Sequence, residues 1–224
     1  MTGRHEGAPM SIIAISAGLG SPSASQMLAK RIIDALHAAR PQRQADEIRL
    51  VELRDIAREL LNAELTHMPS PAVRRLTGEM ARADALVVVT PVYNAQPAAI
   101  LSLLLEVVDK DSLRGTPVLL GATGGTPRHS LVLDRALVPL FHYLHAVVAP
   151  VSVYAATEDW ASNSLDERVH RAADSLLDLL NLPAGGPSDP PATGIPQAYG
   201  GPGLDDDFET MLARVEAGGH ATTR

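Results

Sequence analysis

ALVVVT at residues 85–90 is an apolar run in which no polar residue alternates with the valines, and Asp84 and Pro91 bound it. A strand with one face in water alternates apolar and polar residues, whereas an uninterrupted run is typical of a strand buried on both faces. Burial of both faces requires helices on either side of a mostly parallel sheet. VLL at residues 118–120 repeats the pattern. The sequence therefore predicts an α/β protein.

Strand-like and helix-like segments alternate along most of the chain. Short apolar runs bounded by turn-forming residues predict five strands, at 11–16, 47–51, 85–90, 116–121 and 147–154. Apolar residues at helical spacing predict helices near 25–39, 71–82, 98–108, 129–145 and 165–180. Such alternation favours a flavodoxin-like, doubly wound five-stranded parallel sheet with helices on both faces, and that class has the strand order 2-1-3-4-5.

The composition divides the 224 residues into one domain and two terminal segments. We expect a mobile extension at 1–10, the flavodoxin-like domain at 11–181 and a tail rich in proline and glycine at 182–224. Within the tail, an acidic run at 205–207 precedes an apolar stripe of Phe208, Met211, Leu212 and Val215, which predicts a short amphipathic helix.

Charge and cysteine content exclude several classes of function. The net charge of −7 argues against a nucleic-acid or anionic-membrane surface, because both partners require a concentrated basic field. The absence of cysteine excludes disulfides and thiolate metal sites. The polar start at residues 1–9 has no apolar segment of the kind found in signal peptides. We therefore expect a cytoplasmic protein with no membrane and no nucleic-acid partner.

Open α/β sheets bind ligands beyond the carboxyl ends of the strands, where the strand order reverses. Here that point lies between the first and third strands. Three loops converge on it: the first loop (16–25), the second loop (90–97) and the third loop (121–129). We therefore expect the binding site among these loops.

The first loop, SAGLGSPSAS, combines small residues with hydroxyl groups ahead of a helix. Backbone N–H groups at a helix start and nearby hydroxyls bind phosphate, so the loop predicts a phosphate site. A glycine-rich turn whose serine caps the helix is an equal alternative. The loop has neither a third glycine at Ser23 nor a Gly-Lys-Ser/Thr run, so a monophosphate fits better than a dinucleotide or a triphosphate.

The second and third loops suit a flat ligand. TPVYNAQP at 90–97 places Tyr93 between two prolines, and Pro97 is suited to the first turn of the next helix. GATGGTPRH at 121–129 allows backbone N–H groups to approach a planar ring. A rigid crossover and an ordinary glycine turn remain the structural alternatives. We expect a bulky residue at Gly124 to abolish ring binding and leave the fold intact.

Together the three loops resemble the NADPH-dependent FMN reductase family, in particular members that supply reduced flavin to two-component monooxygenases. The resemblance rests on residues 18–25, on TPVYN at 90–94 with a helix ending in VVD at 107–109, and on ATGG at 122–125, and it covers residues 11–181. It implies that the first loop holds the FMN phosphate, the second lines the isoalloxazine ring and the third lies at the pyrimidine edge. The implied cofactor-binding residues are Ser16, Gly20, Ser21, Ser23, Ser25, Pro91, Val92, Tyr93, Asn94, Thr123, Gly124 and Gly125.

The resemblance also implies hydride transfer from NADPH or NADH to FMN with no catalytic side chain, and a homodimer or homotetramer that uses an apolar face of helix 100–108. Relatives commonly carry an arginine in the first loop, whereas this chain has Gly20-Ser21-Pro22. His142, His145 and His129 lack a positioned third ligand, so we expect no metal site.

Two other functions fit the same residues. A reductase with bound FMN could pass electrons to quinones, azo dyes or metal oxyanions. A flavodoxin-type electron carrier would instead hold FMN tightly without using NAD(P)H, but such carriers sandwich the ring between aromatic residues, and aromatic residues make up only 3% of this chain.

Overall fold

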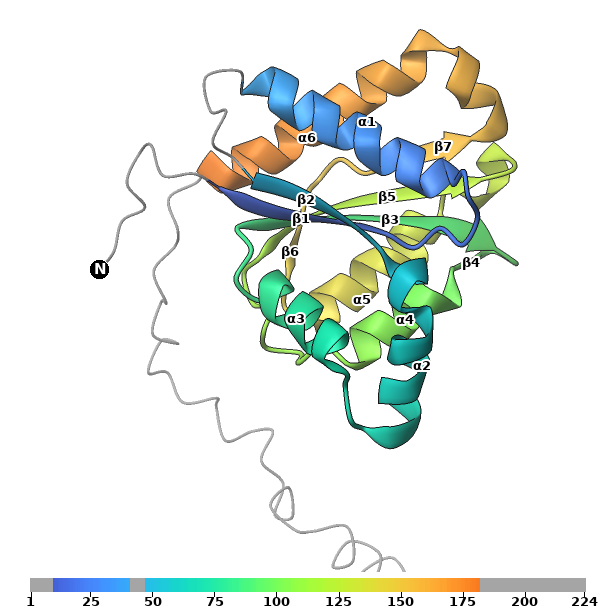
Figure 1. The fold of residues 1–224 in the computed structure, drawn as a ribbon. Helices are drawn as coiled ribbons and strands as arrows, with labels where there is room; N and C mark the ends of the chain where they lie inside the picture. The colour runs from blue at the N-terminus through green and yellow to red at the C-terminus, as the bar shows by residue number, and fades with distance from the viewer. Residues whose placement is uncertain (1–9, 41–46, 182–224) are drawn as a thin grey trace, which may run out of the picture. The chain divides into compact units, whose positions relative to one another are not determined.

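The computed structural model describes residues 10–40 and 47–181, which form a sheet between two helical layers (Figure 1). The segment before residue 10 and the predicted helix near 205–215 lie outside these described residues. Met10, which we placed in the N-terminal extension, is buried in the core at 8% exposure. No described helix is both long and apolar enough to cross a membrane.

The sheet has the predicted flavodoxin-like arrangement with two local differences. The parallel strands β2 (Glu47–Glu52), β1 (Ser11–Ser16), β3 (Ala85–Tyr93) and β5 (Pro117–Gly124) are neighbours in that order. The fifth position is divided between β6 (Val147–Val148) and β7 (Val153–Ala156), which both pair with β5, and β4 (Gln96–Pro97) adds an antiparallel pair to β3. Pro150 between β6 and β7 has no N–H for a ladder, which accounts for the division.

Both faces of the sheet are buried, as the apolar run in β3 predicts. Val87 and Val89 lie in the core under α1 (Ala24–Ala39) and α6 (Asn163–Asn181). Leu86 and Val88 lie in the opposite core, under α2 (Ala57–Thr66), α3 (Pro71–Met80), α4 (Ala99–Glu106) and α5 (Val138–Tyr143) (Figure 1). Successive residues of one strand thus serve two separate cores.

Helix α2 was not predicted. Its apolar pattern is weak because only Leu60 and Ala63 are buried, whereas Leu61 and Leu65 are exposed. The buried residues alone are too few to reveal a helical stripe in the sequence.

The helix predicted at 129–145 is present over residues 132–143, with a π-helical turn within it. The segment forms a 3-10 turn, η2 (Pro127–His129), a π-helical turn, η3 (Leu133–Leu137), and the short helix α5. Pro139 cannot donate an N–H to the preceding turn, and the π-helical turn lies directly before the helix that contains Pro139.

Much of the apolar face of α4, which we expected to form an oligomer surface, packs within its own chain. Ile100, Leu101, Leu104 and Leu105 are all buried in the core of their own chain. An apolar stripe in a sequence does not distinguish a core from an interface, and here the core accounts for it.

Glu106, at the end of α4, offers a test of the packing between α2 and α4. Partial desolvation and the neighbouring Glu64 of α2 raise the pKa of Glu106 from its ordinary value of 4.5. A raised carboxyl pKa means that the folded state favours the protonated form, so ionisation near neutral pH lowers stability. We expect Glu106→Gln to raise the free energy of unfolding at pH 7, and the gain to vanish as the pH falls below 4.5. Urea unfolding across this pH range measures it, with exposed Glu167→Gln on α6 as the control.

Candidate functional site

The three loops predicted to form the site all begin at one edge of the sheet. The parallel register aligns Ser16 of β1 with Val89 of β3, and Pro91 of β3 with Thr123 of β5. The carboxyl ends of β1, β3 and β5 therefore deliver the first, second and third loops to the same place, at the point where the strand order reverses.

Ser16 is the most informative residue of the first loop. It ends β1, and it lies on the same face as Ile12 and Ala14, which pack under α1. Only 1% of Ser16 is exposed, and its hydroxyl has no hydrogen-bond partner. A buried hydroxyl without a partner is costly, so its position next to the start of α1 points to a ligand that supplies the missing bond.

The remainder of the first loop is shaped by Ser23. Ser23 is the N-cap of α1, and its hydroxyl accepts a hydrogen bond from the Gln26 N–H at 3.3 Å. A Cβ on Gly18 would lie 1.8 Å from the Ser23 hydroxyl oxygen, so only glycine fits there. The structural alternative, a serine that caps the helix, is thus correct for Ser23, and the N–H groups of the first turn of α1 still face the loop.

Ser25 connects the first loop to the third. Its hydroxyl and that of Thr123 are 2.9 Å apart and hydrogen-bonded, and both residues are buried. Ser21, by contrast, is exposed at the crest of the loop. The four serines predicted together therefore occupy four different environments: Ser16 is buried without a partner, Ser23 caps α1, Ser25 bridges to Thr123, and Ser21 is exposed.

The second loop is a hairpin rather than an irregular crossover. β3 continues to Tyr93 and pairs with β4 through Tyr93 and Gln96. Asn94 and Ala95 form the turn with φ angles of 50° and 61°, the left-handed values of a tight two-residue hairpin. Pro97 belongs to β4 and not to the first turn of α4, so that expectation is wrong.

The hairpin displays Tyr93 at its end. The side chain is 49% exposed, while Val92 packs against the core. The base of the hairpin is fixed by the Thr90 hydroxyl, which accepts a hydrogen bond from the Ala98 N–H at 3.0 Å. An anchored strand thus holds an exposed aromatic ring at the edge where the ligand is expected.

The third loop starts later than predicted, because β5 extends to Gly124 and pairs there with Ala156. A Cβ on Gly124 would lie 2.1 Å from the Tyr154 hydroxyl oxygen, which donates a hydrogen bond to the Thr126 carbonyl at 2.7 Å. Gly124 is therefore required by the packing of Tyr154, and the expectation that a bulky residue there leaves the fold intact is wrong. Gly125 is different, since a Cβ there would meet nothing within 4 Å.

Tyr154 is a buried residue that the sequence analysis missed. Burial, and then the nearby carboxylate of Asp159, raise the pKa of the Tyr154 phenol, so the hydroxyl remains a donor. Asp159 lies in η4 (Thr157–Ala161), where it accepts a hydrogen bond from the Ala156 N–H at 2.7 Å and forms an ion pair with Arg168 at 2.7 Å.

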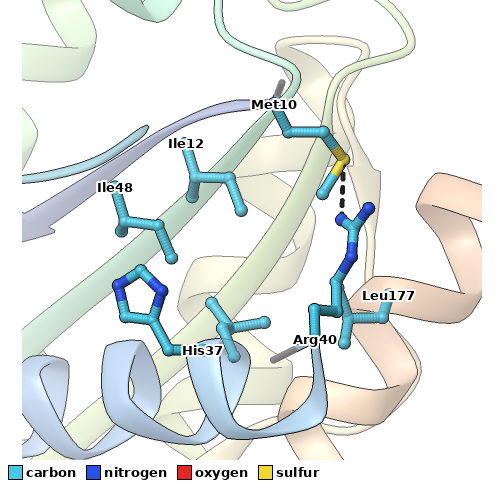
Figure 2. A pocket seen from close by; sticks show the side chains of 7 residues that line it. Met10, Ile12, His37, Arg40, Ile48 and Leu177 are labelled. Atoms are coloured by element: carbon cyan, nitrogen blue, oxygen red, sulfur yellow. Dashed lines mark hydrogen bonds between the residues drawn. The ribbon is translucent and has the colours of Figure 1, made fainter. Parts of the chain in front are cut away.

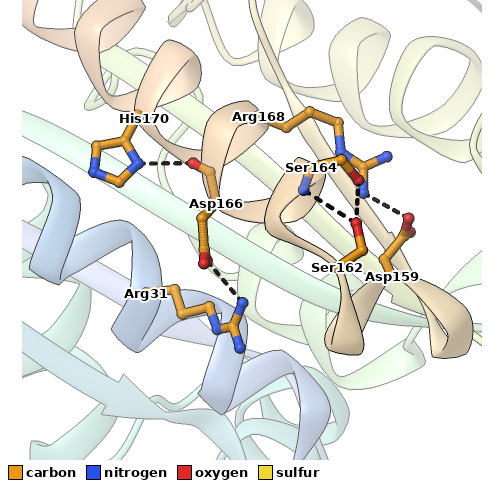
Figure 3. Close-up of polar contacts among 7 residues, drawn as sticks. All are labelled: Arg31, Asp159, Ser162, Ser164, Asp166, Arg168 and His170. Carbon is orange, nitrogen blue, oxygen red and sulfur yellow. Dashed lines mark hydrogen bonds and ion pairs between the residues drawn. The ribbon is translucent and has the colours of Figure 1, made fainter.

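Polar contacts between α1, η4 and α6 support the same end of the sheet (Figure 3). Arg31 of α1 forms an ion pair with Asp166 of α6 at 2.8 Å, and its guanidinium lies 5.2 Å from the centroid of the Trp160 ring. Trp160 is therefore occupied in a contact with α1, which keeps the segment after β7 in place.

Arg54 is the second residue that the sequence analysis missed. It lies in η1 (Leu53–Ile56), directly after β2, and its Nη1 donates a hydrogen bond to the Gly20 carbonyl at 2.6 Å. The first loop contains no arginine, but the neighbouring strand brings one to it. The predicted strand order already placed β2 beside β1, but it did not indicate which side chain after β2 reaches the first loop.

A separate hollow lies at the opposite edge of the sheet, among Met10, Ile12, His37, Arg40 and Ile48 (Figure 2). Its volume is about 10 Å³, which is enough for one water molecule at most. Among the described residues, no group of three or more His, Asp or Glu side chains could hold a metal ion. The hollow therefore cannot compete with the three loops as a flavin site.

The fold and the three loops define a flavodoxin-like α/β protein with a serine- and glycine-rich loop and an exposed aromatic hairpin at the switch point of the sheet. The model of the NADPH-dependent FMN reductase family matches residues 10–161. The chain belongs to this family.

Individual relatives agree with that membership. The FMN reductase (NADPH) of Pseudomonas aeruginosa is 36% identical over 77% of this chain and 93% of its own length. The NADH-dependent FMN reductase SfnF of Pseudomonas fluorescens is 38% identical over 77% of this chain and 92% of its own. The structure of an oxidoreductase from Corynebacterium diphtheriae, 36% identical, superimposes with a TM-score of 0.73 over 77% of this chain and 97% of its own.

Proposed function

We propose that this chain is an FMN reductase that uses NADPH or NADH, with the flavin held by the three loops. The observation that carries the proposal is the buried Ser16 hydroxyl without a partner, next to the start of α1 in a member of this family. Bound FMN would accept a hydride from the nicotinamide. The reduced FMN would then either leave the protein or pass its electrons to an acceptor.

The residues of the first loop fit a flavin phosphate. The Ser16 hydroxyl requires a hydrogen-bond partner, and Gly18 allows the loop to close tightly over Ser23. The N–H groups of the first turn of α1 favour a negative charge in front of them. We assign the phosphate to Ser16, Gly20, Ser21, Ser23 and Ser25, with Ser16 as the principal hydroxyl because Ser23 and Ser25 already have partners.

The second and third loops fit the ring. We assign one face of the ring to the hairpin residues Pro91, Val92, Tyr93 and Asn94, and the pyrimidine edge to the segment Thr123–Gly125. Tyr93 offers an exposed aromatic surface, and the open space at Gly125 allows close approach of a planar group. Hydride transfer requires two stacked rings at the correct distance and no acid or base, so the protein's role is to position them and exclude water.

Three further proposals extend this function. Reduced FMN is delivered to a partner monooxygenase, which the resemblance to reductases of two-component systems supports. The chain works as a homodimer or homotetramer, as the same resemblance suggests. It acts in the cytoplasm, a reducing compartment that suits a chain without cysteine.

Anaerobic oxidation of NADPH and of NADH by the purified protein, with and without FMN, tests the function. We expect oxidation that depends on FMN and saturates with it. A parallel assay offers a quinone in place of free FMN to protein that already carries flavin. Turnover with the quinone but not with free FMN would indicate a quinone-type reductase. Tight FMN binding without any nicotinamide oxidation would indicate an electron carrier, and either result would refute the proposal.

A further inference from the structure

Arg54 connects the crest of the first loop to the start of α1 through a chain of contacts. Its Nη1 donates to the Gly20 carbonyl at 2.6 Å, and its Nη2 lies 2.7 Å from a carboxylate oxygen of Glu52. The other carboxylate oxygen of Glu52 accepts a hydrogen bond from the side-chain amide of Gln26, in the first turn of α1. The side chain of Arg54 is 26% exposed, so it is held in place rather than free in solvent.

The contact fixes the orientation of one peptide group. In a trans peptide the C=O and the N–H point in opposite directions, so a Gly20 carbonyl directed at Arg54 turns the Ser21 N–H to the other side. Glycine rotates easily about its backbone bonds, and without Arg54 the Gly20 carbonyl could turn into the cradle. A carbonyl oxygen facing a phosphate repels it, whereas an N–H in that place binds it.

The charge of Arg54 is largely balanced where it stands. Glu52 lies at 2.7 Å, and Asp55 lies at 3.7 Å from the Arg54 Nε. Two carboxylates this close cancel the positive field that a lone arginine would create at the loop. Orientation of the loop, rather than direct attraction of an anion, is therefore the larger effect.

We propose that Arg54 is a positioning residue for the phosphate cradle: it holds the Gly20 carbonyl outward and thereby presents the Ser21 N–H to the flavin phosphate. This role rests on the proposed function, and it is performed from η1, outside the first loop. It makes Arg54 a determinant of the preference for FMN over riboflavin, which has the same ring but no phosphate.

Binding of FMN and of riboflavin, each measured by quenching of flavin fluorescence, tests the proposal. We expect Arg54→Gln to weaken FMN binding at least about tenfold, near the lower limit for loss of a hydrogen bond to a charged group, and to leave riboflavin binding unchanged. Arg54→Lys keeps the charge, but a lysine ammonium cannot contact Gly20 and Glu52 together as the planar guanidinium does. Compared with Arg54→Gln, it should restore less than half of the lost difference in binding free energy between FMN and riboflavin. Arg58→Gln, at an exposed position on α2, removes the same charge nearby and should change nothing.

The outcomes separate this proposal from the function on which it rests. A wild-type protein that does not prefer FMN to riboflavin would refute the phosphate cradle and Arg54's role together. A wild-type preference that persists in Arg54→Gln would refute only the role of Arg54. Full recovery of the preference for FMN in Arg54→Lys, or an equal loss of it in Arg58→Gln, would show that positive charge determines the preference and that the orientation of the Gly20 carbonyl does not. Equal melting temperatures of the variants exclude unfolding as the cause.

Discussion

Gly18→Ala should lower the affinity for FMN about 100-fold, or by about 2.8 kcal/mol. The added Cβ would lie 1.8 Å from the Ser23 hydroxyl oxygen and 2.9 Å from the Ser23 Cβ, so Ser23 must move. Because Ser23 caps α1, the Gln26 N–H loses the hydrogen bond that it donates to the Ser23 hydroxyl, and the first turn of the helix shifts relative to Ser16. A phosphate requires the helix N-terminus and the Ser16 hydroxyl at a fixed position relative to each other, and the substitution disturbs that arrangement.

An FMN titration and a thermal melt measure this effect. Loss of the cap should cost about 1 kcal/mol of folding stability, so the protein remains folded. Gly78→Ala in α3 is a matched control, because its Cβ would approach only the end of the Arg82 side chain, at 3.4 Å. The control should bind FMN normally and melt slightly higher, since alanine favours a helix over glycine. Unchanged FMN affinity in Gly18→Ala would show that the first loop is not part of the flavin site.

Gly125→Leu should reduce FMN binding below detection while the fold stays intact. A Cβ at Gly125 meets nothing within 4 Å and the residue is exposed, so we expect the protein to accommodate a leucine there. Surface substitutions of this kind change stability by about 0.5 kcal/mol or less. The leucine side chain would fill the space that we assign to the pyrimidine edge of the ring, and a flat ligand cannot move aside without losing its contacts.

Gly124→Ala is the informative partner of this variant. Its Cβ would lie 2.1 Å from the Tyr154 hydroxyl oxygen, so alanine must displace a buried ring and its hydrogen bond to Thr126. We therefore expect Gly124→Ala to lower the melting temperature and Gly125→Leu to leave it unchanged. Normal FMN binding by Gly125→Leu would show that the ring lies elsewhere.

The fold was predictable because the apolar runs carry direct physical information. Val87, Val88 and Val89 are buried on alternate faces, and only a sheet covered by helices on both sides buries all three. The π-helical turn before Pro139 and the gap between β6 and β7 at Pro150 were harder to predict. A proline excludes one hydrogen bond but does not determine which irregular conformation replaces it. Helix α2 was missed because it buries too few residues to show a period.

The candidate site was predictable in its loops but not in their internal contacts. Small residues and hydroxyls after β1 indicated a phosphate site. The different hydrogen-bond partners of Ser16, Ser23 and Ser25 depend on the three-dimensional structure and could not be predicted from the sequence. The glycine pair suggested an approach for a ligand, but Tyr154 accounts for Gly124. Arg54 escaped notice because the predicted strand order places the segment after β2 near the first loop but does not indicate which of its side chains makes a contact there.

A crystal structure of this protein with FMN tests the central claim most directly. We expect the phosphate within hydrogen-bond distance of the Ser16 hydroxyl, in front of the first turn of α1. We also expect the ring between the hairpin at Tyr93 and the backbone at Gly125. An FMN phosphate out of reach of Ser16, or a flavin bound at any other edge of the sheet, would contradict the central claim.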